Sequence, residues 1–326
     1  MLFYPLAALF PTLWIPPLGI GLSLAQLASP SPDSGIVSPS PVDSETLGAS
    51  LTLFQGFILG LVQGLTEFLP ISSTAHLKVV PMLLGWGDPG VSVTAVIQLG
   101  SIVAVLGYFR ADLLALAQGT LKALQTRDFQ IQEFRMSLGI ALGTLPILAV
   151  GLGIKLWVPD YDRSPLRSLG AIAVVSAVMA LLLALAEQVG RRQRTTEQLT
   201  MGDGILMGCA QALAIVPGVS RSGSTLTAGL LMGLERAAAA RFSFLLGIPA
   251  ITIAGLVELK DLLDTGIPSS AWGGVIMGLG SALVFSYASI AWLLRYLQTQ
   301  NTWLFVWYRL AFAVALGVIT LSSSGF

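Results

Sequence analysis

The sequence comprises 326 residues, of which 54% are hydrophobic and only 10% are charged. A soluble domain of this length cannot bury so much apolar material, so the composition predicts an all-α polytopic membrane protein. The formal net charge of zero gives no support to nucleic-acid binding, the single Cys excludes an intramolecular disulfide, and the single His argues against a multi-histidine metal site.

The first fifty residues differ in composition from the rest of the chain. Residues 6–28 are apolar but contain three prolines, and residues 29–50 are rich in Ser, Pro and Asp. We interpret residues 1–50 as a signal-like or single-pass leader followed by a disordered linker, and residues 51–326 as a membrane-embedded domain. The stretch lacks the positively charged start of a secretory signal, which leaves cleavage of the leader open.

The apolar segments of the domain fall into two lengths. Two pairs of short segments are each split at a Pro and a Ser-rich turn, and because a half-length helix cannot span a membrane, we expect each pair to form a re-entrant hairpin. Six other segments are long enough to cross ~30 Å of hydrocarbon. The short pairs lie near 51–69 with 73–84 and near 203–216 with 221–232, and the spans lie at about 93–109, 137–158, 168–187, 240–262, 272–295 and 303–322.

The two hairpins lie one internal repeat apart, since Gln63 and Gln211 are 148 residues apart and Pro70 and Pro217 are 147 apart. Each repeat, about 51–187 and about 203–322, then holds one hairpin and three spans. An odd number of crossings predicts two inverted-topology repeats with a site between them. Ten of the seventeen Lys and Arg residues lie on the side assigned to the cytoplasm, so the first hairpin is expected to open to the outer, periplasmic side.

The first turn concentrates polar side chains at membrane depth. Gln63 and Glu67 are four residues apart on one helix face, Ser73 and His76 share a face of the next helix, and Ser72 takes the N-cap position. Interrupted helix survives at this depth only where protein or a water-filled cavity surrounds it. Glu67 alone could be an interfacial carboxylate, and His76 alone could be a hydrogen-bonded core histidine. Their joint occurrence predicts a functional cavity.

The second turn combines a helix start with a cation. Ser220, Arg221 and Ser222 follow Pro217-Gly218 and offer backbone N–H groups, hydroxyls and a guanidinium to a ligand. Helix N-termini attract phosphate, and the planar Arg fork donates parallel hydrogen bonds to it. The turn therefore favours a phosphate ligand.

Residues 63–76 (Gln-Gly-Leu-Thr-Glu-Phe-Leu-Pro-Ile-Ser-Ser-Thr-Ala-His) and 217–225 (Pro-Gly-Val-Ser-Arg-Ser-Gly-Ser-Thr) closely resemble the two signatures of the bacterial undecaprenyl-diphosphatase family, and the similarity runs from about Leu51 to the C-terminus. The resemblance implies a hydrolase of the bacterial plasma (inner) membrane that converts undecaprenyl diphosphate to undecaprenyl phosphate and inorganic phosphate, recycles the lipid carrier of peptidoglycan synthesis and confers bacitracin resistance. The implied partners are a polyprenyl diphosphate substrate and membrane lipid, and the sequence leaves open whether a homodimer forms.

Two positions depart from the family pattern. Many members have Glu where this chain has Gln63, and Gly where it has Ala75. An amide cannot act as a base, so Glu67 is left to supply most of the negative charge at any Mg²⁺ or Ca²⁺ site, with the substrate diphosphate completing the coordination shell.

The catalytic hypothesis takes Ser73 as nucleophile, His76 as its base, Arg221 as the group that neutralises developing charge, and Glu67 as metal ligand. Attack by His76, a metal-activated water, and Glu67 as the base all stay open. A secondary transporter or lipid-carrier flippase is the rival reading, because inverted repeats with broken helices are also transporter architecture. The expected phosphate-contacting or capping residues are Gln63, Ser72, Thr74, Ser220, Ser222 and Thr225.

Overall fold

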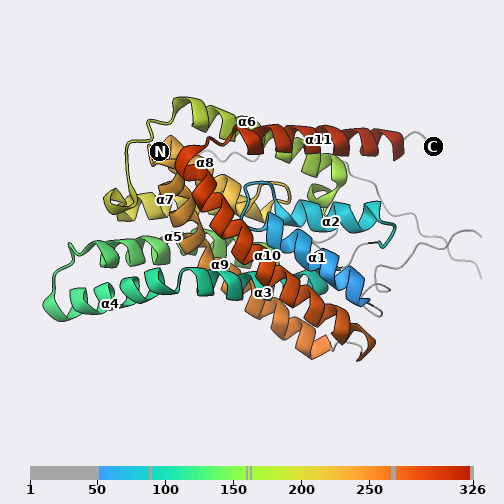
Figure 1. Ribbon diagram of the computed structural model, residues 1–326, viewed down its shortest axis with the longest axis horizontal. Coiled ribbons are helices and arrows are strands. Elements are labelled where there is room, and N and C mark those ends of the chain that lie inside the picture. Colours follow the sequence, from blue (N-terminus) through green and yellow to red (C-terminus); the bar gives the residue numbers. More distant parts are fainter. Residues whose placement is uncertain (1–50, 88–89, 159–160, 162–163, 266–268, 324–326) are drawn as a thin grey trace, which may run out of the picture. The chain divides into compact units, whose positions relative to one another are not determined.

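The computed structural model describes residues 51–87, 90–158, 161, 164–265 and 269–323, all within one unit of the chain, Val42–Phe326. These residues form helices and contain no β-strand, which confirms the predicted all-α class (Figure 1). The predicted leader and linker, residues 1–50, lie outside the described residues. The helices are α1 (Leu53–Thr66), α2 (Ser73–Leu83), α3 (Gly90–Tyr108), α4 (Arg110–Thr126), α5 (Gln132–Trp157), α6 (Leu169–Val189), α7 (Met201–Ala212), α8 (Arg221–Leu231), α9 (Arg236–Thr265), α10 (Trp272–Thr299) and α11 (Trp303–Ser323), with short 3₁₀ turns η2 (Pro165–Arg167), η3 (Thr196–Gln198), η4 (Leu213–Ile215) and η5 (Ser269–Ala271).

Five of the described helices are long and apolar enough to cross a membrane, and α3 with α4 adds a sixth if the bent pair counts as one span. The five are α5, α6, α9, α10 and α11, at positions close to those predicted. The chain bends by 65° between α3 and α4. The sequence analysis did not predict α4, which carries Arg110, Asp112 and Lys122. The charges do not prevent a helix; they prevent burial of its surface in hydrocarbon.

Each pair of short helices breaks at a proline. α1 ends before Pro70 and α2 begins at Ser73, whereas η4 ends before Pro217 and α8 begins at Arg221. Proline lacks the N–H that a helix interior needs, and its ring clashes with the preceding turn, so the chain changes direction at both places. The two breaks lie where the sequence predicted them. That each pair forms a re-entrant hairpin stays a prediction.

Glycines allow the first helix of each short pair to lie directly on a long helix. A Cβ built at Gly56 of α1 would lie 1.9 Å from the Gly274 carbonyl oxygen of α10, and a Cβ built at Gly208 of α7 would lie 2.0 Å from the Gly143 carbonyl oxygen of α5. No side chain fits at such separations. Small residues of this kind let helix backbones approach closely in membrane proteins, where tight packing replaces the hydrophobic driving force.

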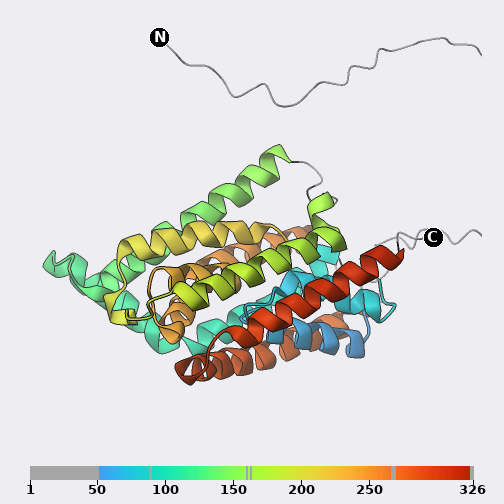
Figure 2. The same ribbon diagram turned by 90° about the horizontal axis from the view of Figure 1, so that it is seen from above.

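The packing brings the two turns together. α1 lies on α10 and α7 lies on α5, while α3 packs against α9 and α6 against α11. Both views place α1 and α2 toward one end of the bundle and α7 toward the other (Figures 1 and 2). The turns meet between them, where the Ser222 hydroxyl donates to the Leu69 carbonyl at 2.8 Å. Phe68 of the first turn packs edge-on against Phe244 of α9, with ring centroids 5.3 Å apart. The inverted-repeat relation itself stays a prediction.

Candidate active site

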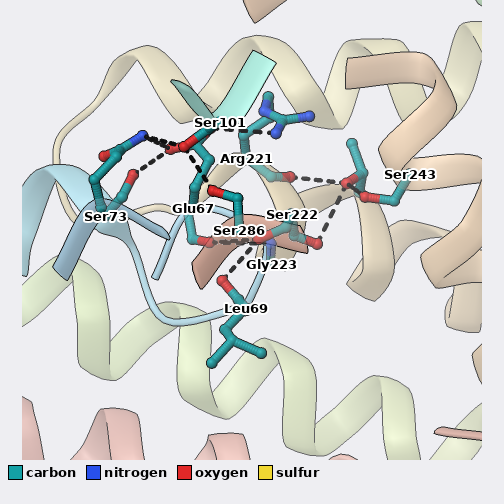
Figure 3. A network of polar contacts seen from close by, with 12 residues as sticks. Glu67, Leu69, Ser73, Ser101, Arg221, Ser222, Gly223, Ser243 and Ser286 are labelled. Atoms are coloured by element: carbon teal, nitrogen blue, oxygen red, sulfur yellow. Dashed lines mark hydrogen bonds and ion pairs between the residues drawn. The ribbon is translucent and has the colours of Figure 1, made fainter. Parts of the chain in front are cut away.

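Glu67 lies where the two turns meet and accepts hydrogen bonds from both. The Ser73 hydroxyl donates to Glu67 Oε2 at 2.7 Å, and the Gln63 amide donates to the same oxygen at 3.1 Å. Arg221 Nη2 lies 3.3 Å from Glu67 Oε1 and forms an ion pair with it (Figure 3). The structure therefore gathers four residues that the sequence singled out, although Arg221 is 154 positions from Glu67 in the chain.

Two serines from long helices hold Gln63, and the sequence reasoning missed both. The Gln63 amide contacts Ser101 Oγ of α3 at 3.5 Å, and Ser286 of α10 donates its hydroxyl to Ser101 at 2.8 Å (Figure 3). All three side chains are buried. Single serines in apolar helices give little signal, because their hydroxyls so often bond to the backbone of their own helix.

Both ring nitrogens of His76 contact groups other than the Ser73 hydroxyl. Its Nδ1 lies 2.7 Å from the Ser72 carbonyl oxygen, and its Nε2 lies 2.7 Å from the Tyr308 hydroxyl of α11. Because a carbonyl only accepts, Nδ1 carries the proton, and in a neutral ring Nε2 then accepts from Tyr308. The ring is also stacked on Phe312 with centroids 4.4 Å apart. The expected serine–histidine pair is thus replaced by a Ser73–Glu67 pair.

The residue that precedes each second helix has a left-handed backbone. Ser72 has φ of 75° and Ser220 has φ of 72°, which is uncommon for residues other than glycine. Ser220 caps α8 as predicted, since its hydroxyl accepts from the Gly223 N–H at 3.1 Å. Ser72 takes the N-cap position without a capping hydrogen bond, and its hydroxyl pairs instead with Thr74 Oγ1 at 3.2 Å.

The remaining predicted hydroxyls contact protein groups. Ser222 bonds to the first turn, and Thr225 shares a 2.5 Å hydrogen bond with Ser243 of α9 while donating to the Arg221 carbonyl at 2.8 Å (Figure 3). Both side chains are buried. In this arrangement they hold α8 against the first turn and against α9.

Arg221 keeps unused donors. Its Nε and Nη1 are buried and have no hydrogen-bond partner within the described part of the chain. Gly247 of α9 makes room for the guanidinium, since a Cβ there would lie 1.4 Å from Arg221 Nη1. A buried donor without a partner is costly, and in a functional site it marks where an acceptor binds. The unused N–H groups of Arg221 suit an anionic ligand.

Arg309 of α11 is a second arginine at the turns, and the sequence reasoning did not find it. Arg309 is 1% exposed, and its hydrogen bonds within the described part of the chain all go to main-chain carbonyls. The acceptors are the carbonyl oxygens of Pro70 at 3.0 Å, Gly218 at 2.6 Å, Val219 at 3.2 Å and Ser176 at 3.3 Å. A lone basic residue within an apolar span was the available signal.

A cavity of about 220 Å³ opens beside the first turn. Ser73 connects it to the Glu67–Arg221 pair, because Ser73 lines the cavity and its hydroxyl donates to Glu67. Basic, acidic and uncharged polar side chains contribute to the wall. They include Gln63, Thr74, Gln98, Lys78, Arg167 and Glu258.

The donor set fits a hard divalent cation only as a shared site. Among the described residues no three His, Cys, Asp or Glu side chains lie close enough to hold a metal alone. The Glu67 carboxylate and the Gln63 amide are the nearest donor groups, and the carboxylate is already engaged by Arg221. Mg²⁺ is commonly held by one or two carboxylates together with substrate phosphates, and this set is compatible with that mode.

The sequence pattern of the family described as "Bacitracin resistance protein BacA" matches residues 56–315, which include both turns. The chain belongs to the BacA family. Three relatives, each named "Undecaprenyl-diphosphatase", are similar over nearly their whole length. They come from a Nostoc species (61% identical, 87% of this chain and 89% of the relative), a Synechocystis species (59%, 94% and 91%) and Synechococcus elongatus (63%, 82% and 96%).

Proposed function

We infer that this BacA-family chain is a multi-pass membrane hydrolase that converts undecaprenyl diphosphate to undecaprenyl phosphate and inorganic phosphate, the activity named in its relatives. The reaction returns the lipid carrier used in peptidoglycan synthesis, and bacitracin resistance fits the family description. The observation that carries the inference is Ser73, which lines a cavity that also contains basic, acidic and amide side chains and whose hydroxyl is hydrogen-bonded to a buried carboxylate.

The geometry supports Ser73 as nucleophile and Glu67 as its base. Ser73 Oγ attacks the terminal phosphorus, its proton passes along the 2.7 Å hydrogen bond to Glu67 Oε2, and the bond from phosphorus to the bridging oxygen breaks. Undecaprenyl phosphate leaves as an anion. Water then attacks the phosphoserine and the bond from phosphorus to Ser73 Oγ breaks. Glu67 returns its proton to Ser73 Oγ, and both protons of the water leave with inorganic phosphate as dihydrogen phosphate, so the serine and the carboxylate are regenerated.

Arg221 supplies the positive charge that this reaction needs. Phosphoryl transfer depends mainly on positioning and on neutralising charge on the transferred oxygens. The buried Nε and Nη1 groups of Arg221 lack partners, so they can donate to those oxygens without first breaking a protein hydrogen bond. The ion pair to Glu67 holds the guanidinium beside the reacting serine.

His76 acts on the turn in this proposal. Its Nδ1–H donates to the Ser72 carbonyl, directly before Ser73, and Tyr308 fixes the other side of the ring. Holding that carbonyl keeps α2 aligned, so that the Ser73 hydroxyl points at Glu67. We therefore propose that His76 orients the nucleophile and does not remove its proton.

A divalent cation and a membrane orientation complete the proposal. Glu67 and Gln63, together with the diphosphate, would hold Mg²⁺ or Ca²⁺, which would neutralise phosphate charge. The distribution of basic residues supports placement in the bacterial inner membrane with the first hairpin open to the periplasmic side.

Phosphate release from undecaprenyl diphosphate by purified protein tests the activity, and radiolabelled substrate tests the nucleophile. Label trapped on Ser73 supports the mechanism, and label trapped on His76 would identify His76 as the nucleophile instead. The absence of a phosphoenzyme favours attack by water. Ser73→Ala should lose at least ~10²-fold in kcat. Ser137→Ala is a matched control, because Ser137 pairs with Thr120 on α4, away from the turns. A wild-type protein that releases no phosphate refutes the function.

A further inference from the structure

Arg309 is the largest fully buried side chain among the described residues, and it bonds to both turns at once. Its Nη1 donates to the Pro70 carbonyl of the first turn and to the Val219 carbonyl of the second. Its Nη2 donates to the Gly218 carbonyl, and its Nε bonds to Ser176 of α6. One guanidinium therefore joins two turns that are almost 150 residues apart in sequence.

The carbonyls that Arg309 binds lie directly upstream of the two left-handed serines. Pro70 is two residues before Ser72, and Gly218 and Val219 immediately precede Ser220. A strained backbone of this kind persists only when its surroundings fix it from several sides. Arg309 supplies that restraint to both turns, and the residues that follow the strained positions are Ser73 and Arg221, which carry the chemistry in the proposed function.

Stability alone does not account for this arrangement. None of the ion pairs among the described residues includes Arg309, so its charge is balanced only by carbonyl dipoles. A charge in an apolar span is expensive, and such residues mark functional sites in membrane proteins more often than structural ones. Arginine also suits the geometry, because its planar fork directs several N–H groups at fixed angles, whereas lysine has three donors on a flexible stem.

We propose that Arg309 is a positioning residue that locks the two turns in one arrangement and thereby holds Ser73, Glu67 and Arg221 within reach of one diphosphate. It does not contact the substrate. The inference rests on the proposed function for its kinetic consequence, but the locking of the turns is a structural claim that can be measured without any substrate.

Kinetics distinguish positioning from plain stabilisation. Arg309→Met should lower kcat by about 100-fold and Arg309→Lys by about 10-fold, with KM changing less than about threefold, because alignment is lost while substrate contacts remain. Arg236→Met is the matched control. It breaks the ion pair with Glu187, which joins the C-terminal end of α6 to the N-terminal end of α9, and it should leave kcat unchanged. Variants that melt at a lower temperature but keep wild-type kcat in the folded fraction would overturn the proposal.

A double-mutant cycle adds a readout that a structural role would not produce. If Arg309 acts by placing Arg221, then Arg309→Lys combined with Arg221→Lys should cost little more than the worse single variant. Losses that multiply would show independent roles and refute the inference.

A distance measurement separates this inference from the enzymatic one. Spin labels at Met82→Cys on α2 and Leu231→Cys on α8, both exposed positions, report the relative placement of the two helices that leave the turns, in a Cys209→Ser background. The unsubstituted protein should give one narrow distribution, Arg309→Lys a broader one, and Arg236→Met a narrow one. A narrow distribution in Arg309→Lys overturns the proposal whether or not the protein hydrolyses diphosphates.

Discussion

Gly247→Ala tests whether the position of the Arg221 guanidinium controls the reaction. Gly247 lies on α9, and a Cβ at this position would lie 1.4 Å from Arg221 Nη1 and 2.5 Å from its Cζ. Carbon atoms in ordinary contact are about 3.5 Å apart, so the methyl group must displace the guanidinium by about 2 Å. The Arg221–Glu67 ion pair, already 3.3 Å long, would not survive that shift.

The expected loss follows from that displacement. A misplacement of ~1 Å in a catalytic group can cost ~10²-fold in rate, so kcat should fall by at least about 100-fold, equivalent to about 2.7 kcal/mol of transition-state stabilisation. The loss caused by Arg221→Ala sets the upper limit. The fold should persist, because the guanidinium is the end of a flexible side chain and can move without displacing backbone.

The assay is inorganic phosphate release by purified protein in detergent, with thermal unfolding recorded in parallel. Gly280→Ala on α10 is the matched control, since a Cβ there meets no atom within 4 Å. It should retain full activity with equal or slightly higher stability, because alanine favours helix over glycine by about 1 kcal/mol. A Gly247→Ala protein whose kcat stays within threefold of wild type would refute the placement of Arg221.

Three further outcomes are expected. Glu67→Gln should lower kcat by ~10²-fold or more, because an amide cannot accept the Ser73 proton, and single-turnover phosphate release checks this. Removing divalent cations with a chelator should reduce phosphate release and added Mg²⁺ should restore it, whereas an undiminished rate in the chelator contradicts the shared metal site. Burial raises the pKa of Asp203, but hydrogen bonds from Arg194 and Thr200 lower it more, so its net pKa lies below the ordinary value. The stability that this carboxylate contributes is therefore present above about pH 4 and is lost as the pH falls through its folded-state pKa. Asp203→Asn should lower the melting temperature at neutral pH, and that difference should shrink in acid.

Hydropathy and helix-breaking residues were enough to locate most helices and both turns. Apolar length depends on local composition, and Pro70 and Pro217 interrupt the chain through their own covalent structure, so neither signal needs tertiary information. α4 was missed because this reasoning assigns charged stretches to loops. The side chains of Arg110 and Lys122 can instead point outward from a surface helix.

The pairings within the site could not be predicted. Ser73 and His76 share a helix face by spacing, which predicted that they would meet. The imidazole Nε2 instead contacts the hydroxyl of Tyr308, a residue 232 positions away in the sequence. Spacing fixes where a Cβ points, whereas partners from distant segments select the side-chain conformation.

Arg309 shows the same limit. Its charge within an apolar helix was visible, but its acceptors are main-chain carbonyls, which carry no sequence signature. Gly247 lies within the part of the sequence that resembles the family. The residues next to it in the sequence do not indicate that its lack of a side chain makes room for the Arg221 guanidinium.

The close seating of α1 on α10 bears on how the protein is made. α1 is among the first described helices to be synthesised, and the surface that fits its glycines is almost the last, so α1 must wait in the bilayer without its final partner. If synthesis stopped before α10, the glycine face of α1 would have no helix to pack against. Expressing the two halves as separate polypeptides should therefore give material that is degraded when either is made alone and rescued when both are made together.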